Sequence, residues 1–324
     1  MRGVLSAVLA GIVAVVLAST AAEASGASCS VRGGAPVAQT MRRTPWGDPD
    51  LQGVWSGADS MAVPLDRAEE LGSRNVLTEA EFQARRVKLV EGTSSSNIEA
   101  TNFGVEAEIL QSTSRQASLV VDPPNGRRPP RLSAADSQAP LRTGFSPGVF
   151  ASVAELGGLD RCIASGTVPT MHAFNGIEIV QAPGYVAIRT EVIHEARVIP
   201  LDGRAHLGES ITTYAGDSRG RWEGRTLVVE TTNLNGRSNL SGNAGERPTT
   251  RTRVIERYSL TDRDLLWYEA TIDDPGTWTR PWTIVFPRTR DSKHGLYEYA
   301  CHEGNYSVRN ILSASRAAES PIAK

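Results

Sequence analysis

Short runs of alternating apolar and polar residues fill the second half of the chain and are typical of strands with one buried face. Turn formers such as Pro183-Gly184 and Glu223-Gly224 separate neighbouring runs and predict antiparallel hairpins. The predicted strands are 176–181, 185–193, 196–201, 220–222, 225–234, 252–260, 265–272, 282–287 and 295–303. We therefore predict a mainly β fold, an antiparallel β-barrel of lipocalin-like outline, with a β-sandwich as the alternative.

The first half of the chain contains one clear helix signal. Thr78 can cap the helix and Glu81 can complete a capping box, while Leu77 can pack on Phe82 as a hydrophobic staple. These features predict a helix from Thr78 to about Val90.

Turn-forming residues surround this helix and predict an irregular layer rather than a separate domain. The stretch 44–55 is dense in Pro, Gly and Asp, and we expect it to form an ordered turn that plugs Trp46 and Trp55 against the barrel. A short apolar strand opens 118–133 and an extended Pro-rich loop follows it. We predict that residues 44–160 form a layer packed on the barrel, which comprises residues 161–324.

The N-terminus has the layout of a cleaved export signal. Arg2 precedes an apolar run over 4–18, and Ala22-Glu23-Ala24 supplies a small-x-small cleavage site. An uncleaved anchor is the alternative, but the run is short for a hydrocarbon core of about 30 Å. We predict a signal peptide over 1–24 and a flexible leader over 25–43. The mature chain is then expected in the periplasm or outside the cell, without a membrane span.

The charge balance and the motifs of the chain limit the classes of partner and cofactor that we expect it to bind. Lys and Arg number 34, Asp and Glu number 36, and the formal net charge is −2 over 324 residues. Such a balance argues against nucleic acid as the main partner. The chain lacks the glycine-rich nucleotide-binding motifs, so we predict no nucleotide cofactor. A small molecule is the expected partner, and the oligomeric state stays open.

The chain has three cysteines, at positions 29, 162 and 301. In an oxidising compartment, thiols that can meet normally pair. Cys29 lies in a tail rich in Gly, Ser and Ala, which leaves Cys162 and Cys301 as the expected disulfide. A free, nucleophilic Cys301 is the alternative.

Two stretches, 191–206 and 301–303, concentrate residues that can carry chemistry. General acid–base catalysis needs an imidazole that titrates near neutral pH and a carboxylate that orients it, and an arginine can hold an anionic intermediate. We expect a bulge at His194-Glu195 to re-aim a side chain. The predicted catalytic residues are His194, Arg197, Asp202, His302 and Glu303. The predicted substrate-binding residues are Glu191, His206, Trp278 and Tyr299.

If Cys301 is bridged near the end of a last strand, His302 points to the opposite face of that strand. We expect His302 or Glu303 there in one cluster with His194 and Arg197, which can also include Asp202, opening to a cavity. The leading functional hypothesis is an exported, cofactor-independent enzyme that performs His/carboxylate acid–base chemistry, as a lyase, an isomerase or a hydrolase. The alternative is an extracytoplasmic ligand-binding protein without turnover.

Other interpretations of these residues remain open. The stretch 191–206 can be an exposed face with ordinary ion pairs. A metal site of His194, His206 and His302 is a minority alternative, because no close ligand spacing such as HExxH occurs. GxSxG is absent as well, so a serine-based triad lacks its usual support.

Recurrent motifs cover nearly the whole mature chain. They are TPWGDPDLQGVW (44–55), LVVDPPNG (119–126), RCIASGTVP (161–169), IHEARVIPLDGRAH (193–206), GDSRGRWEGRTLVVETTN (216–233), DDPGTWTRPWT (273–283) and YEYACHEGNY (297–306). In these motifs the chain resembles a large family of exported bacterial proteins. The resemblance implies no particular reaction. The motif positions include Cys162, His194, Arg197, Asp202, His206, Cys301, His302 and Glu303, whereas His172 and His294 fall outside.

The chain departs from the family pattern at Arg225, where an acidic residue is usual, and at Ala205, where proline is usual. It also differs at Phe174-Asn175-Gly176. These departures concern substrate preference more than the fold.

Overall fold

The computed structural model describes residues 42–60, 62–96, 112–133, 139–142, 146, 148–158, 160–163, 168, 176–240, 247–293 and 295–319, without the side chains of 92–96 and 194. The predicted signal peptide, nearly all of the predicted leader, Cys29, His172 and His294 lie outside these ranges.

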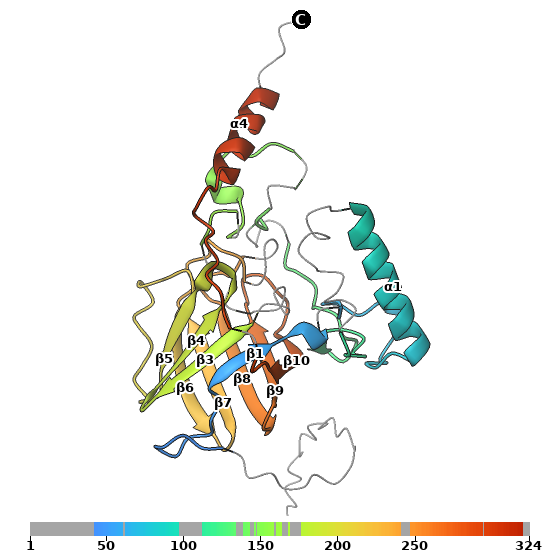
Figure 1. Ribbon diagram of the computed structural model, residues 1–324. Coiled ribbons are helices and arrows are strands. Elements are labelled where there is room, and N and C mark those ends of the chain that lie inside the picture. The colour runs from blue at the N-terminus through green and yellow to red at the C-terminus, as the bar shows by residue number, and fades with distance from the viewer. Residues whose placement is uncertain are drawn as a thin grey trace, which may run out of the picture. The chain divides into compact units, whose positions relative to one another are not determined.

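An antiparallel sheet of ten strands forms the body of the protein (Figure 1). Its strands are β1 (Gly53–Ser56), β2 (Val120–Asp122), β3 (Ile177–Ala182), β4 (Tyr185–Thr190), β5 (Ala196–Pro200), β6 (Asp217–Glu223), β7 (Thr226–Thr232), β8 (Arg253–Asp262), β9 (Leu265–Asp273) and β10 (Trp282–Arg290). The order is β5-β4-β3-β1-β10-β9-β8-β7-β6, and β2 pairs with β10 beside this path. The hairpins β3–β4, β6–β7 and β8–β9 are those that the turn signals predict.

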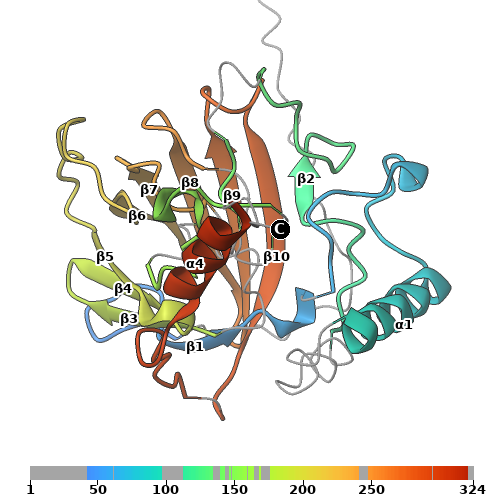
Figure 2. The ribbon, with the colours of Figure 1, turned by 90° about the horizontal axis from the view of Figure 1, so that it is seen from above.

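The sheet curls until its two end strands meet, as the view from above shows (Figure 2). Side chains of β5 and its extension pack directly on β6. A Cβ placed on Gly220 would lie 2.6 Å from Leu201 Cδ2 and 2.8 Å from Ile199 Cγ2. The sheet is thus nearly closed into a barrel, and the predicted antiparallel β-barrel is confirmed.

The core lies inside this barrel and follows from the alternation of the strands. In β8, β9 and β10 every second residue is buried, and these residues share one face. Most of the buried residues are apolar or aromatic, including Ile177, Ile179, Val186, Ile199, Leu227, Tyr258, Tyr268 and Phe286. The few charged side chains on the same face form the candidate site described below.

The predicted strand at 295–303 is wrong. Residues 295–300 form no strand, turns follow at 301–304, and Tyr297 is 71% exposed. The reason is that both long edges of β10 are already used, one by β9 and the other by β1 and β2. The segment predicted as a turn, 53–56, supplies β1, and it buries Trp55 while Trp46 stays partly exposed.

Helices lie outside the barrel. α1 (Glu79–Ser96) has the predicted capping box, since Thr78 N donates to Glu81 Oε2 at 2.8 Å and Glu81 N donates to Thr78 Oγ1 at 3.3 Å. α1 extends past the predicted end near Val90. Leu77 and Phe82 share a small core with Ala117.

The structure also has a helix that the strand pattern did not predict, α4 (Ser307–Glu319), near the C-terminus. Short 3-10 turns lie at η1 (Ala58–Ser60), η2 (Glu69–Leu71), η3 (Val153–Glu155) and η4 (Val192–His194). In the described part of the chain, no helix combines the length and apolar character needed to cross a membrane.

Candidate functional site

A buried ion pair crosses the inner face of the barrel. Arg197 of β5 donates from Nη1 to Glu256 Oε2 at 2.6 Å and from Nη2 to Glu256 Oε1 at 2.9 Å. Glu256 of β8 is fully buried, and the Arg197 side chain is 11% exposed. Burial lowers the pKa of the Arg197 guanidinium, but the charge of Glu256 outweighs it, so this pKa lies above its ordinary value.

Two tyrosine hydroxyls complete the shell of Glu256. Tyr258 and Tyr268 donate to Glu256 Oε1 at 2.8 and 3.0 Å, and both side chains are fully buried. Their rings lie 5.1 Å apart between centroids. Burial, reinforced by the charge of Glu256, raises the pKa of both hydroxyls well above the ordinary value, so they stay protonated donors.

Arg288 of β10 is the second cation of the barrel interior and lacks such a shell. Its side chain is fully buried. Nη1 donates to the Trp55 carbonyl oxygen at 3.4 Å, whereas Nε and Nη2 have no hydrogen-bond partner among the described residues. The guanidinium carbon lies 5.2 Å from the ring centroid of Phe286 and 6.0 Å from that of Tyr268. Burial lowers the pKa of Arg288.

The predicted catalytic residues are distributed over different places. Arg197 lies inside the barrel, but Asp202 forms an exposed ion pair with Arg204, which lowers the pKa of Asp202 to about 2. His302 and Glu303 lie in an exposed turn. No described hydrogen bond or ion pair joins Arg197 to Asp202, His302 or Glu303. The side chain of His194 lies outside the described atoms.

The segment around His194 is irregular, although not as the predicted bulge. Residues 192–194 form η4, in which Ile193 adopts a left-handed φ of 62°. Glu191 precedes this turn, and its Oε1 accepts a hydrogen bond from the Tyr297 amide at 3.4 Å. The C-terminal segment therefore passes beside Glu191, although Tyr297 precedes the stretch 301–303 and this contact is not part of the predicted cluster.

His206 has two carboxylate neighbours. Its Nδ1 lies 2.8 Å from Asp217 Oδ2, and its Nε2 lies 3.9 Å from Glu230 Oε1. The Asp217 carboxylate also accepts from Arg219 Nη1 at 2.6 Å. Burial raises the pKa of Asp217, but hydrogen bonds from the Leu207 amide, His206 and Arg219 outweigh it and hold that pKa below its ordinary value.

The two aromatic residues predicted to bind substrate differ in burial. Trp278 is buried and meets Trp282 edge-on, with 5.8 Å between ring centroids. Tyr299 is 38% exposed in the C-terminal segment. Trp278 therefore belongs to the core, and Tyr299 to the surface.

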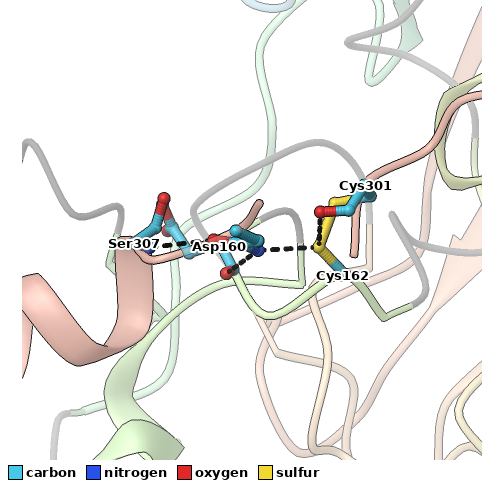
Figure 3. The surroundings of a disulfide bond; sticks show 5 residues. Asp160, Cys162, Cys301 and Ser307 are labelled. Atoms are coloured by element: carbon cyan, nitrogen blue, oxygen red, sulfur yellow. Dashed lines mark hydrogen bonds between the residues drawn. A yellow bond between two sulfur atoms is a disulfide. The ribbon is translucent and has the colours of Figure 1, made fainter. Parts of the chain in front are cut away.

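The predicted disulfide between Cys162 and Cys301 is present, with 5.6 Å between their Cα atoms (Figure 3). Cys301 is thus bonded rather than a free nucleophile. Asn305 Nδ2 contacts Cys162 Sγ at 2.8 Å and the Asp160 carbonyl oxygen at 3.3 Å. Asn305 Oδ1 accepts from the Ser307 amide at 2.9 Å, so the same residue joins the bridge to the start of α4.

Within the described ranges, three or more His, Cys, Asp and Glu side chains are nowhere grouped as metal ligands would be. No protein-family model matches the chain, and no curated protein matches it either. We therefore infer the function from the geometry of the barrel interior.

Proposed function

We propose that the protein is an exported barrel that binds a small organic molecule against the polar groups of its inner face. The observation that carries this proposal is the convergence of Arg197, Glu256, Tyr258, Tyr268 and Arg288 on a face that is otherwise apolar. A few placed polar groups among apolar and aromatic side chains are the usual composition of small-molecule sites.

Export is part of the proposal. The N-terminal sequence pattern predicts it, and the disulfide is consistent with an oxidising compartment. Arg197 takes part in this site through its position inside the barrel, in a role different from the catalytic one that its sequence neighbourhood predicts.

A second candidate function is catalysis by His206 with Asp217. The observation that favours it is the contact of 2.8 Å between Nδ1 and Oδ2, in which a carboxylate orients an imidazole that is 25% exposed. An oriented imidazole can act as a general base on a small substrate. This keeps His/carboxylate acid–base chemistry as a candidate, but with a pair different from the predicted cluster.

The two candidates give different results in one experiment. The purified full-length protein is incubated with pools of small organic acids, alcohols and amides, and both the protein complex and the free pool are followed by mass spectrometry. We expect some pool members to be retained by the protein and recovered unchanged. New masses that disappear in a His206→Gln variant would instead establish the catalytic candidate, and a pool that is neither retained nor converted would contradict both.

A further inference from the structure

Arg288 is the least satisfied charged group that the structure describes inside the barrel. A guanidinium has five N–H donors, and here one nitrogen makes a single long hydrogen bond while two have no partner among the described residues. A buried charge without partners is destabilising, whereas a ligand that supplies acceptors removes that penalty. The sheet fixes Arg288 in this position, because 282, 284, 286 and 288 form one buried series along β10.

The unpartnered atoms lie on one edge of the guanidinium. Nε and Nη2 donate in nearly parallel directions along that edge, while Nη1, which contacts Trp55, lies on another edge. Two parallel N–H donors match the two oxygens of a carboxylate and form a bidentate pair with it. The free edge is therefore complementary to a planar anion with two oxygens.

Charge balance favours an anion with a single charge. Glu256 is neutralised by Arg197 at 2.6 Å, and its Oε1 also accepts hydrogen bonds from Tyr258 and Tyr268. Arg288 thus remains as one positive charge without a counter-charge in this cluster. One carboxylate would neutralise it, whereas a doubly charged phosphate would leave a negative charge in a buried site.

The surroundings of Arg288 are aromatic. The rings of Phe286 and Tyr268 lie next to each other, with 5.0 Å between their centroids, and the guanidinium carbon lies 5.2 Å and 6.0 Å from these centroids. The fully buried Trp55 supplies the carbonyl contact. An apolar or aromatic body is the type of group that such walls accommodate.

We infer that Arg288 receives the carboxylate of a monocarboxylic acid with an apolar body, held side-on by Nε and Nη2. This inference rests on the proposed binding function and deepens it by assigning the ligand class and the recognising residue. Arg197 is the internal contrast, since it also lies on the inner face but has a carboxylate of its own.

The first test needs no ligand and compares two identical substitutions in the full-length protein after extensive dialysis. Arg288→Met removes an unpaired buried charge, so we expect its melting temperature to rise by about 2–4 °C. Arg197→Met removes the partner of Glu256, so we expect its melting temperature to fall. A fall in Arg288→Met comparable to that in Arg197→Met would mean that Arg288 is structural, and would overturn the inference.

The second test uses octanoate and benzoate as probes, with octanamide and benzamide as matched neutral controls. Calorimetry and the fluorescence of the protein should report binding of a carboxylate to the wild type, and the amide should bind at least about tenfold more weakly. Arg288→Met should lose this preference.

The outcomes separate the two proposals. Equal binding of acid and amide, unchanged in Arg288→Met, would overturn the role of Arg288 while leaving a ligand-binding barrel. Binding of neither class, together with a fall in the melting temperature of Arg288→Met, would contradict both the inference and the proposed function.

Discussion

At the scale of single residues, the two buried arginines differ in what surrounds them. Arg197 is held by both oxygens of Glu256, which also accepts from two tyrosines. A buried ion pair of this kind adds little net stability relative to apolar residues, but removing one partner leaves an uncompensated charge. Glu256 is therefore the residue whose loss disturbs the most contacts in the barrel interior.

We predict that Glu256→Gln lowers the free energy of unfolding by about 3–5 kcal/mol, because Arg197 then stays buried without a counter-charge. The glutamine side chain has nearly the same shape as that of glutamate. The loss of stability therefore reflects the missing negative charge and not a change in side-chain volume. Denaturation with urea measures it.

Glu223→Gln is the matched control for this substitution. Glu223 pairs with Arg221 and Arg257 at 2.6 Å, but it lies on the exposed surface. Solvent screens such pairs, so the unfolding midpoint should stay nearly unchanged. If both variants unfold at the same urea concentration, the Arg197–Glu256 pair does not have the energetic role assigned to it.

At the scale of elements, closure of the barrel depends on close contact between β5 and β6. Gly220 permits this contact, because Leu201 and Ile199 occupy the space where a Cβ would lie. The same approach brings Arg197 of β5 across the interior to Glu256 of β8. Because Gly220 of β6 has no side chain, β5 can lie close to β6, and this position of β5 places Arg197 within reach of Glu256.

We predict that Gly220→Val destabilises the protein by about 1–3 kcal/mol, the usual effect of excess volume in a packed core. Gly208→Val is the control, since a Cβ at Gly208 meets nothing within 4 Å. Thermal and urea denaturation of both variants measure the difference. Equal stability of the two variants would show that β5 and β6 do not close the barrel as described.

The strands that could be predicted are those whose partners are near in sequence. β3 with β4, and β8 with β9, are hairpins with a turn between alternating runs, so local pattern determines them. β1 could not be predicted in this way, because its neighbours are β3 and β10, and its residues follow a series of turn formers. The alternation at 295–303 was misleading for the same reason: a strand that follows β10 and pairs with it requires a free edge of β10, and the sequence does not reveal that β1 and β2 use this edge.

The candidate site was predictable only in part. The cluster at 191–206 drew attention to Arg197, but Glu256 lies 59 positions away, in a strand with no other catalytic signal. One signal was present: Glu256 and Arg288 occupy inward positions of otherwise apolar series in β8 and β10. Charged residues in the buried phase of a strand indicate either a partner or a ligand. The sequence cannot show which of the two applies.

At the scale of the whole described chain, one covalent bond spans most of the sequence that forms the barrel. Cys162 and Cys301 are 139 positions apart, and β3 to β10 all lie between them. The C-terminal segment then continues into α4, where Ser315 Oγ accepts from the Phe150 amide at 2.9 Å and Arg316 donates to the Ala151 carbonyl oxygen at 2.7 Å. The disulfide and α4 therefore attach the same segment at successive points.

We predict that Cys162→Ser combined with Cys301→Ser lowers the free energy of unfolding by about 2–5 kcal/mol, because the unfolded chain regains the entropy that the closed loop removes. A reducing agent should lower the melting temperature of the wild type and leave that of the double variant unchanged. Cys29→Ser is the control and should behave as the wild type does.

Limited proteolysis should also cut between residues 291 and 306 faster in the double variant, because the segment between β10 and α4 then loses its covalent attachment. If reduction changes neither the melting temperature nor the rate of cleavage in the wild type, the bridge does not hold the C-terminal segment on the protein.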